Sequence, residues 1–149
     1  MSFFRQLLIF ILISIIFYYN DIVSIPTTKC LNNITVQKQN KVYGLLFIHH
    51  FISVIAHFGW LSTSRPLLYF YVSFNFVIFV HWLTNKDKCI VTETINKYCN
   101  FPKDRLFPDA FEVLGFKKYP QWNNKLHHVY IILGTIIGII KLYFHTNIF

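Results

Sequence analysis

The sequence is poor in charged residues, and acidic ones are especially scarce. Of its 149 residues only 13% are charged, with six Asp and Glu against fourteen Lys and Arg, while 54% are hydrophobic. An ordinary soluble domain carries about 25% charged residues. The composition, with a mean hydropathy of +0.44, therefore predicts one small membrane domain spanning residues 1–149.

The chain also lacks the motifs of the common enzyme classes. It has no glycine-rich phosphate loop, no His-Glu-x-x-His pair and no nucleophile elbow. We also expect no Asp or Glu inside the membrane. Its three cysteines, Cys30, Cys89 and Cys99, form no Cys-x-x-Cys pair. They predict one disulfide and one thiol in an oxidising compartment, or three thiols in a reducing one. An enzyme is not favoured.

Positive charge is in excess, with a formal net charge of +8. The basic residues are scattered between apolar segments, as expected for loops beside a bilayer. We therefore expect the lipid bilayer, and not nucleic acid, as the partner.

Long apolar segments are what the chain does have, and they predict an all-α bundle of about four transmembrane helices. About 20 residues of helix cross a hydrocarbon core of roughly 30 Å. The expected spans are residues 3–23, 42–61, 67–84 and 128–146. The first is expected to be an uncleaved anchor, with a cleaved signal peptide as the alternative.

The polar loop, residues 85–126, is expected to carry short interfacial helices. Thr92 would cap a helix over Glu93–Tyr98, and Asp109 with Glu112 forms a capping box for another. Both helices would lie at the bilayer surface.

The second and third spans are expected to form an antiparallel hairpin whose turn is centred near Ser64. At equal distances from that centre, Ser53 lies at the depth of Asn75, and His57 at the depth of Tyr71. Side-chain hydrogen bonds between membrane helices contribute about 0.6 kcal/mol each. These four residues predict a helix-packing seam.

Gly134 and Gly138 have the spacing of a GxxxG motif in the last span. Small residues four apart allow a second helix to approach closely. They predict a helix contact, with another helix or with a second copy of the chain.

Five histidines lie towards one side of the predicted membrane: His49, His50, His81, His127 and His128. Imidazole binds transition metals and haem iron, and helical bundles build such sites from facing helices. The alternative is that these side chains bond neighbouring helices or lie at the interface. We expect no cofactor; haem or a transition metal is the alternative.

Two signals disagree about orientation. A basic N-terminus is normally retained in the cytoplasm, which would place the connector after the first span in the lumen, together with the glycosylation pattern Asn33-Ile34-Thr35. The excess of Lys and Arg in the two longer loops favours the opposite orientation. Asn33 is thus a glycosylation candidate in one orientation only.

One stretch carries a resemblance. His81-Trp82, Asn85, Cys89, Thr92 and Glu93 lie in HWLTNKDKCIVTE, which resembles a segment of uncharacterised small multi-pass membrane proteins, including ones encoded by large DNA viruses. The resemblance implies a membrane protein, in a host membrane if viral, and no activity.

The sequence therefore predicts a small multi-pass integral membrane protein of structural or interaction type. A histidine-lined haem- or metal-binding membrane protein is the alternative.

Overall fold

The chain folds into helices throughout the part that the structure, a computed structural model, describes: residues 2–85, 89–102 and 120–147, without the side chains of 120–127 and 145–147. The elements are α1 (Phe3–Ile22), α2 (Ile25–Asn32), α3 (Val36–Phe58), a 3-10 turn η1 (Gly59–Leu61), α4 (Arg65–Thr84), α5 (Ile90–Cys99) and α7 (Pro120–Asn147). The predicted all-α class is confirmed for these residues.

Three helices are long and apolar enough to cross a membrane: Phe3–Ile22, Val36–Leu61 and Arg65–Thr84. They correspond to the first three predicted spans and are consistent with a membrane protein. In α7 the described apolar stretch, His128–Phe144, is shorter.

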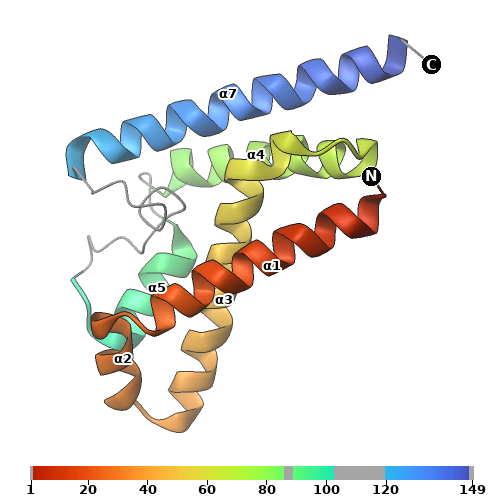
Figure 1. Ribbon diagram of the computed structural model, residues 1–149. Coiled ribbons are helices and arrows are strands. Elements are labelled where there is room, and N and C mark those ends of the chain that lie inside the picture. Colours follow the sequence, from red (N-terminus) through yellow and green to blue (C-terminus); the bar gives the residue numbers. More distant parts are fainter. Residues whose placement is uncertain (1, 86–88, 103–119, 148–149) are drawn as a thin grey trace.

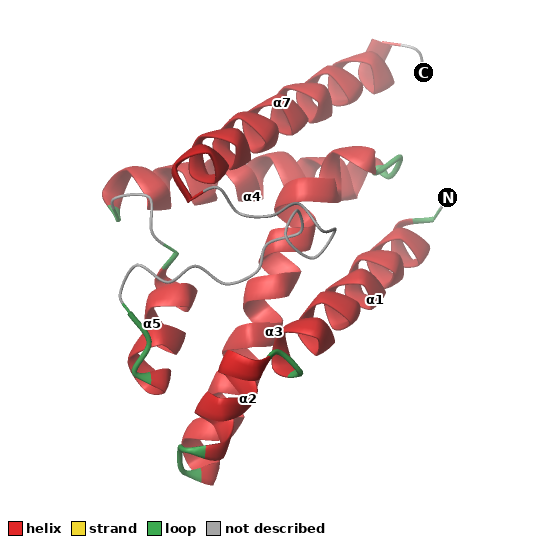
Figure 2. Ribbon diagram, turned by 60° about the vertical axis from the view of Figure 1, so that its left-hand side comes forward, coloured by secondary structure: helices red, strands yellow, loops and turns green. Residues whose placement is uncertain are grey.

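The long helices pack as two pairs. α1 packs against α3, crossing it obliquely, and α4 lies along α7, while α3 crosses α4 steeply (Figures 1 and 2). The predicted antiparallel hairpin of the second and third spans is therefore wrong. The chain changes direction through η1 and the residues 62–64, and the face of α4 that would have met α3 packs mainly on α7.

Two helix starts differ from the prediction. α3 begins at Val36, not at residue 42, because its polar first residues continue the helix beyond the apolar segment. α5 begins at Ile90 after the N-cap Cys89, so Thr92 is a buried residue within the helix and not its cap. The predicted capping box at Asp109 and Glu112 lies outside the described residues.

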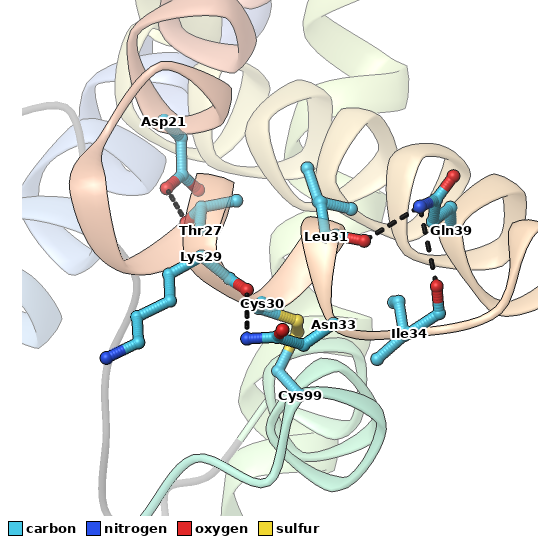
Figure 3. The surroundings of a disulfide bond; sticks show 9 residues. All are labelled: Asp21, Thr27, Lys29, Cys30, Leu31, Asn33, Ile34, Gln39 and Cys99. Atoms are coloured by element: carbon cyan, nitrogen blue, oxygen red, sulfur yellow. Dashed lines mark hydrogen bonds between the residues drawn. A yellow bond between two sulfur atoms is a disulfide. The ribbon is translucent and has the colours of Figure 1, made fainter.

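One end of the molecule, which we call the disulfide end, consists of α2, the first turns of α3, and α5. Cys30 of α2 is bonded to Cys99 of α5, with 5.2 Å between their Cα atoms (Figure 3). Cys89 is a free thiol. An apolar cluster lies beside the bond, with four buried members: Leu31, Val42, Leu46 and Ile95. α5 thus packs on α3 through its apolar face.

The opposite end, which we call the turn end, holds the start of α1, the residues Ser62-Thr63-Ser64 and the last turns of α7 (Figure 1). Gln6 Oε1 accepts from the Ser62 hydroxyl at 2.5 Å and from the backbone N–H groups of Thr63 at 3.0 Å and Ser64 at 3.3 Å. Lys141 Nζ donates to the carbonyls of Trp60 at 2.8 Å and Ser62 at 3.3 Å. One amide and one ammonium group therefore hold the chain reversal.

Candidate functional site

A cavity of about 260 Å³ lies where α3 and α4 diverge. α3 lines it with residues at helical spacing, and α4 does the same from the other wall; the lining is closed by the start of α5 and by Ile131 of α7. From α3 come His49, Ile52, Ser53, Ala56 and His57, and from α4 come Phe74, Val77, Ile78, His81 and Trp82. The steep crossing of the two helices is what leaves this space.

Three imidazoles and one thiol face this otherwise apolar cavity: His49, His57, His81 and Cys89. His81 Nε2 accepts from the Ile90 N–H at 3.3 Å, so its hydrogen lies on Nδ1 when the ring is neutral. The His49 Nδ1 lies 3.5 Å from the Thr92 hydroxyl. α5 is thereby held against both walls of the cavity.

His57 is fixed by its own helix. Its Nδ1 lies 2.6 Å from the Ser53 carbonyl, which only accepts, so Nδ1 carries the hydrogen. The ring stacks on Tyr130 of α7, with 5.7 Å between centroids. The His57 ring, which is 1% exposed, is therefore held by these two contacts.

The structure separates the five predicted histidines. His49 and His81 line the cavity, whereas His50 turns to the opposite face of α3 and lies against Asp21. His128 packs edge-on against Trp82, 4.4 Å between centroids, and the side chain of His127 lies outside the described residues. Within the residues described, no three His, Cys, Asp or Glu side chains gather in a way that could hold a metal ion.

A buried acid and histidine pair was missed by the sequence analysis. Asp21 Oδ2 lies 3.1 Å from His50 Nε2, and Asp21 Oδ1 accepts from the Thr27 hydroxyl at 3.0 Å. Both members are 1% exposed. The predicted first span, residues 3–23, includes Asp21 but gives this acid no partner; α1 continues to Ile22 and carries Asp21 into contact with the middle of α3. The signal was a lone acid inside a span, which needs a partner because an unpaired buried charge is costly.

The four residues of the predicted seam are all buried, but they serve different contacts. Ser53 and His57 bond within α3, and the Tyr71 hydroxyl lies 3.5 Å from the Ala56 carbonyl. Asn75 Nδ2 donates to the Thr135 hydroxyl of α7 at 2.9 Å. Asn75 therefore joins α4 to α7, and Tyr71 joins α4 to α3.

Among the described residues Tyr71 is the largest fully buried side chain, and glycines surround its ring. A Cβ on Gly59 would overlap the ring, one on Gly134 would lie 2.7 Å from the hydroxyl, and one on Gly138 would lie 3.2 Å from Cδ1. We call this set the Tyr71 socket. The predicted GxxxG face of α7 thus meets Tyr71 of the same chain, and a second copy would reach Gly134 and Gly138 only if α7 left α4.

Comparison with protein-family models gives no match to this chain, and neither curated proteins nor solved structures match it. The stretch His81–Glu93 resembles small multi-pass membrane proteins, and this resemblance stays a prediction.

Proposed function

We propose that this chain is a four-span integral membrane protein that acts through its contacts with lipid and with other helices. One observation carries the proposal: the long helices turn apolar side chains outward and polar side chains inward. Their exposed residues include Leu8, Leu12, Ile16, Phe76, Val77, Val80, Leu133, Ile136 and Ile140. Their buried residues include Gln6, Ser14, Asp21, His50, Ser53, His57 and Asn75. A bilayer, unlike water, favours this distribution.

α7 supports a fourth span. Its described apolar stretch His128–Phe144 is about 26 Å long at ~1.5 Å per residue. It lies beside α4, and its last turns reach the turn end through Lys141. A helix of about 17 residues is at the short limit for crossing a bilayer.

A contact role is supported by the partners of the buried polar groups. Asn75 bonds Thr135, Gln6 bonds the residues 62–64, and Lys141 bonds two carbonyls. These bonds all join helices or turns to one another, so they stabilise the bundle. The short helix α5 of the polar loop packs its apolar face on α3 and so adds to the bundle.

The test is fractionation combined with tagged termini. Alkaline carbonate should leave the protein in the membrane pellet, and release into the supernatant would contradict insertion. In sealed vesicles, tags at the two termini should be digested together by added protease, or be protected together, if there are four spans. A digested tag at one terminus and a protected tag at the other would instead give three spans.

The cavity favours a second candidate, a histidine-lined binding protein. Its 260 Å³ is slightly below the roughly 300–1,000 Å³ of common ligand pockets. Haem would therefore require α5 to move away, and a small apolar molecule that bonds one imidazole fits better. Purified protein in mild detergent should be examined for a Soret band, for metal content and for extractable small molecules. Protein free of all three would contradict this candidate, whereas His49→Phe or His81→Phe should remove any ligand that is found.

A further inference from the structure

The disulfide gives the first step towards the orientation of the chain. Cys30 and Cys99 are 69 residues apart in sequence, and their bond joins the connector after α1 to the loop after α4. Both cysteines must therefore lie on one side of the membrane. Disulfides persist in the lumen of the secretory pathway and outside the cell, and are rare in the cytosol.

Asn33 lies directly beside this bond. It is the C-cap of α2, three residues after Cys30, and its side chain is exposed (Figure 3). Its Nδ2 donates to the Lys29 carbonyl at 2.9 Å, which leaves the second amide hydrogen directed elsewhere. The amide of the pattern Asn33-Ile34-Thr35 is therefore accessible from solvent.

Thr35 completes the pattern with an exposed hydroxyl. It is the N-cap of α3 but makes no side-chain capping bond. Residues 36–41 (VQKQNK) then extend α3 by about 9 Å at ~1.5 Å per residue before its apolar part begins. These polar turns hold Asn33 away from the bilayer surface.

We propose that Asn33 carries an N-linked glycan, and that the disulfide end lies in the lumen or outside the cell, with the turn end in the cytoplasm. The donor is a lipid-linked oligosaccharide pyrophosphate. The bond from Asn33 Nδ2 to the first sugar carbon forms, Nδ2 loses one proton, and the lipid pyrophosphate leaves. The proposal rests on membrane insertion, and it adds a modification site and an orientation to the proposed function.

The experiment is expression of the full chain in eukaryotic membranes, followed by glycosidase treatment and electrophoresis. Wild type should shift in mobility on treatment, and Asn33→Gln and Thr35→Ala should not. Two controls should keep the shift: Asn32→Gln, which changes the exposed neighbouring amide, and Thr35→Ser, which preserves the pattern. Pro102→Thr creates a second pattern at Asn100, an exposed residue next to Cys99, and should add a second shift.

Each outcome decides a part of the proposal. An unmodified wild type would overturn the glycan at Asn33. An Asn33→Gln, Pro102→Thr double variant that is also unmodified would overturn the orientation. Carbonate extraction of the same samples reports insertion separately, so a failure of the proposed function is distinguishable from a failure of this inference.

Discussion

The two ends of the molecule are each stabilised by a different kind of interaction. At the turn end, one amide and one ammonium group bind the backbone of the chain reversal, and all the bonds are polar. At the disulfide end, a covalent bond and an apolar cluster around Ile95 join α2, α3 and α5. The difference teaches that short helices such as α2 and α5 need a cross-link, because they bury too little apolar surface alone. The turn between the long helices has apolar packing as well as hydrogen bonds, since Gly59 of η1 lies against the Tyr71 ring.

Loss of the disulfide should have the largest effect on stability. In the chain-entropy model, closing a loop whose ends are 69 residues apart contributes about 4 kcal/mol. Cys99→Ser should lower the Tm measured in detergent, and Cys30→Ser should lower it equally because each removes the same bond. Cys89→Ser is the matched control and should not lower the Tm, because Cys89 is the N-cap of α5 and serine is favoured there. Equal stability of Cys89→Ser and Cys99→Ser would show that the cross-link contributes nothing.

The Tyr71 socket comes next. Gly59→Ala places a methyl group into the Tyr71 ring, and overpacking of this kind costs about 1–3 kcal/mol. Gly44→Ala is the control, because a Cβ there meets nothing within 4 Å and alanine favours the helix. We expect the first variant to lower the Tm and the second to maintain or raise it. A reversed order would contradict the packing of Tyr71 on η1.

The turn end can be tested at Gln6. Gln6→Leu removes the acceptor of three donors and should cost about 1–2 kcal/mol, since some of those donors regain water at the surface. Proteolysis near Ser62 in detergent should become faster. Gln39→Leu is a comparison at the disulfide end, where Gln39 Nε2 donates to the Leu31 carbonyl, and it should leave cleavage near Ser62 unchanged. If both variants accelerate cleavage equally, the two ends are not independent.

The smallest effect is expected between the two ends, at Asn75. A double-mutant cycle of Asn75→Leu and Thr135→Val measures the bond between α4 and α7, which should contribute about 0.6 kcal/mol. His57→Leu with Asn75→Leu should show less coupling, because His57 bonds a carbonyl of its own helix and Asn75 bonds Thr135. Coupling between His57 and Asn75, without coupling between Asn75 and Thr135, would instead support the packing seam predicted from the sequence.

Much of this architecture follows from the sequence alone. The spacing of apolar residues was enough to locate the long helices, because a span must be continuous and must satisfy its backbone internally. The polar residues Ser53, His57, Tyr71 and Asn75 were found as buried side chains for the same reason. Gly134 and Gly138 were found as a helix contact because small residues on one face permit close approach.

What only the tertiary structure decided is which surfaces meet. How helices cross depends on side chains from distant segments. The sequence alone therefore could not show that Asn75 bonds Thr135 or that Gly138 lies against Tyr71. The pairing of Cys30 with Cys99 follows from α5 folding onto α3, a contact with no local signal. The sequence did not reveal the partner of Asp21, because an acid at the end of an apolar segment usually marks the boundary of that segment. His50 of α3 lies next to Asp21 of α1, and the two side chains can be buried together only once these helices are packed.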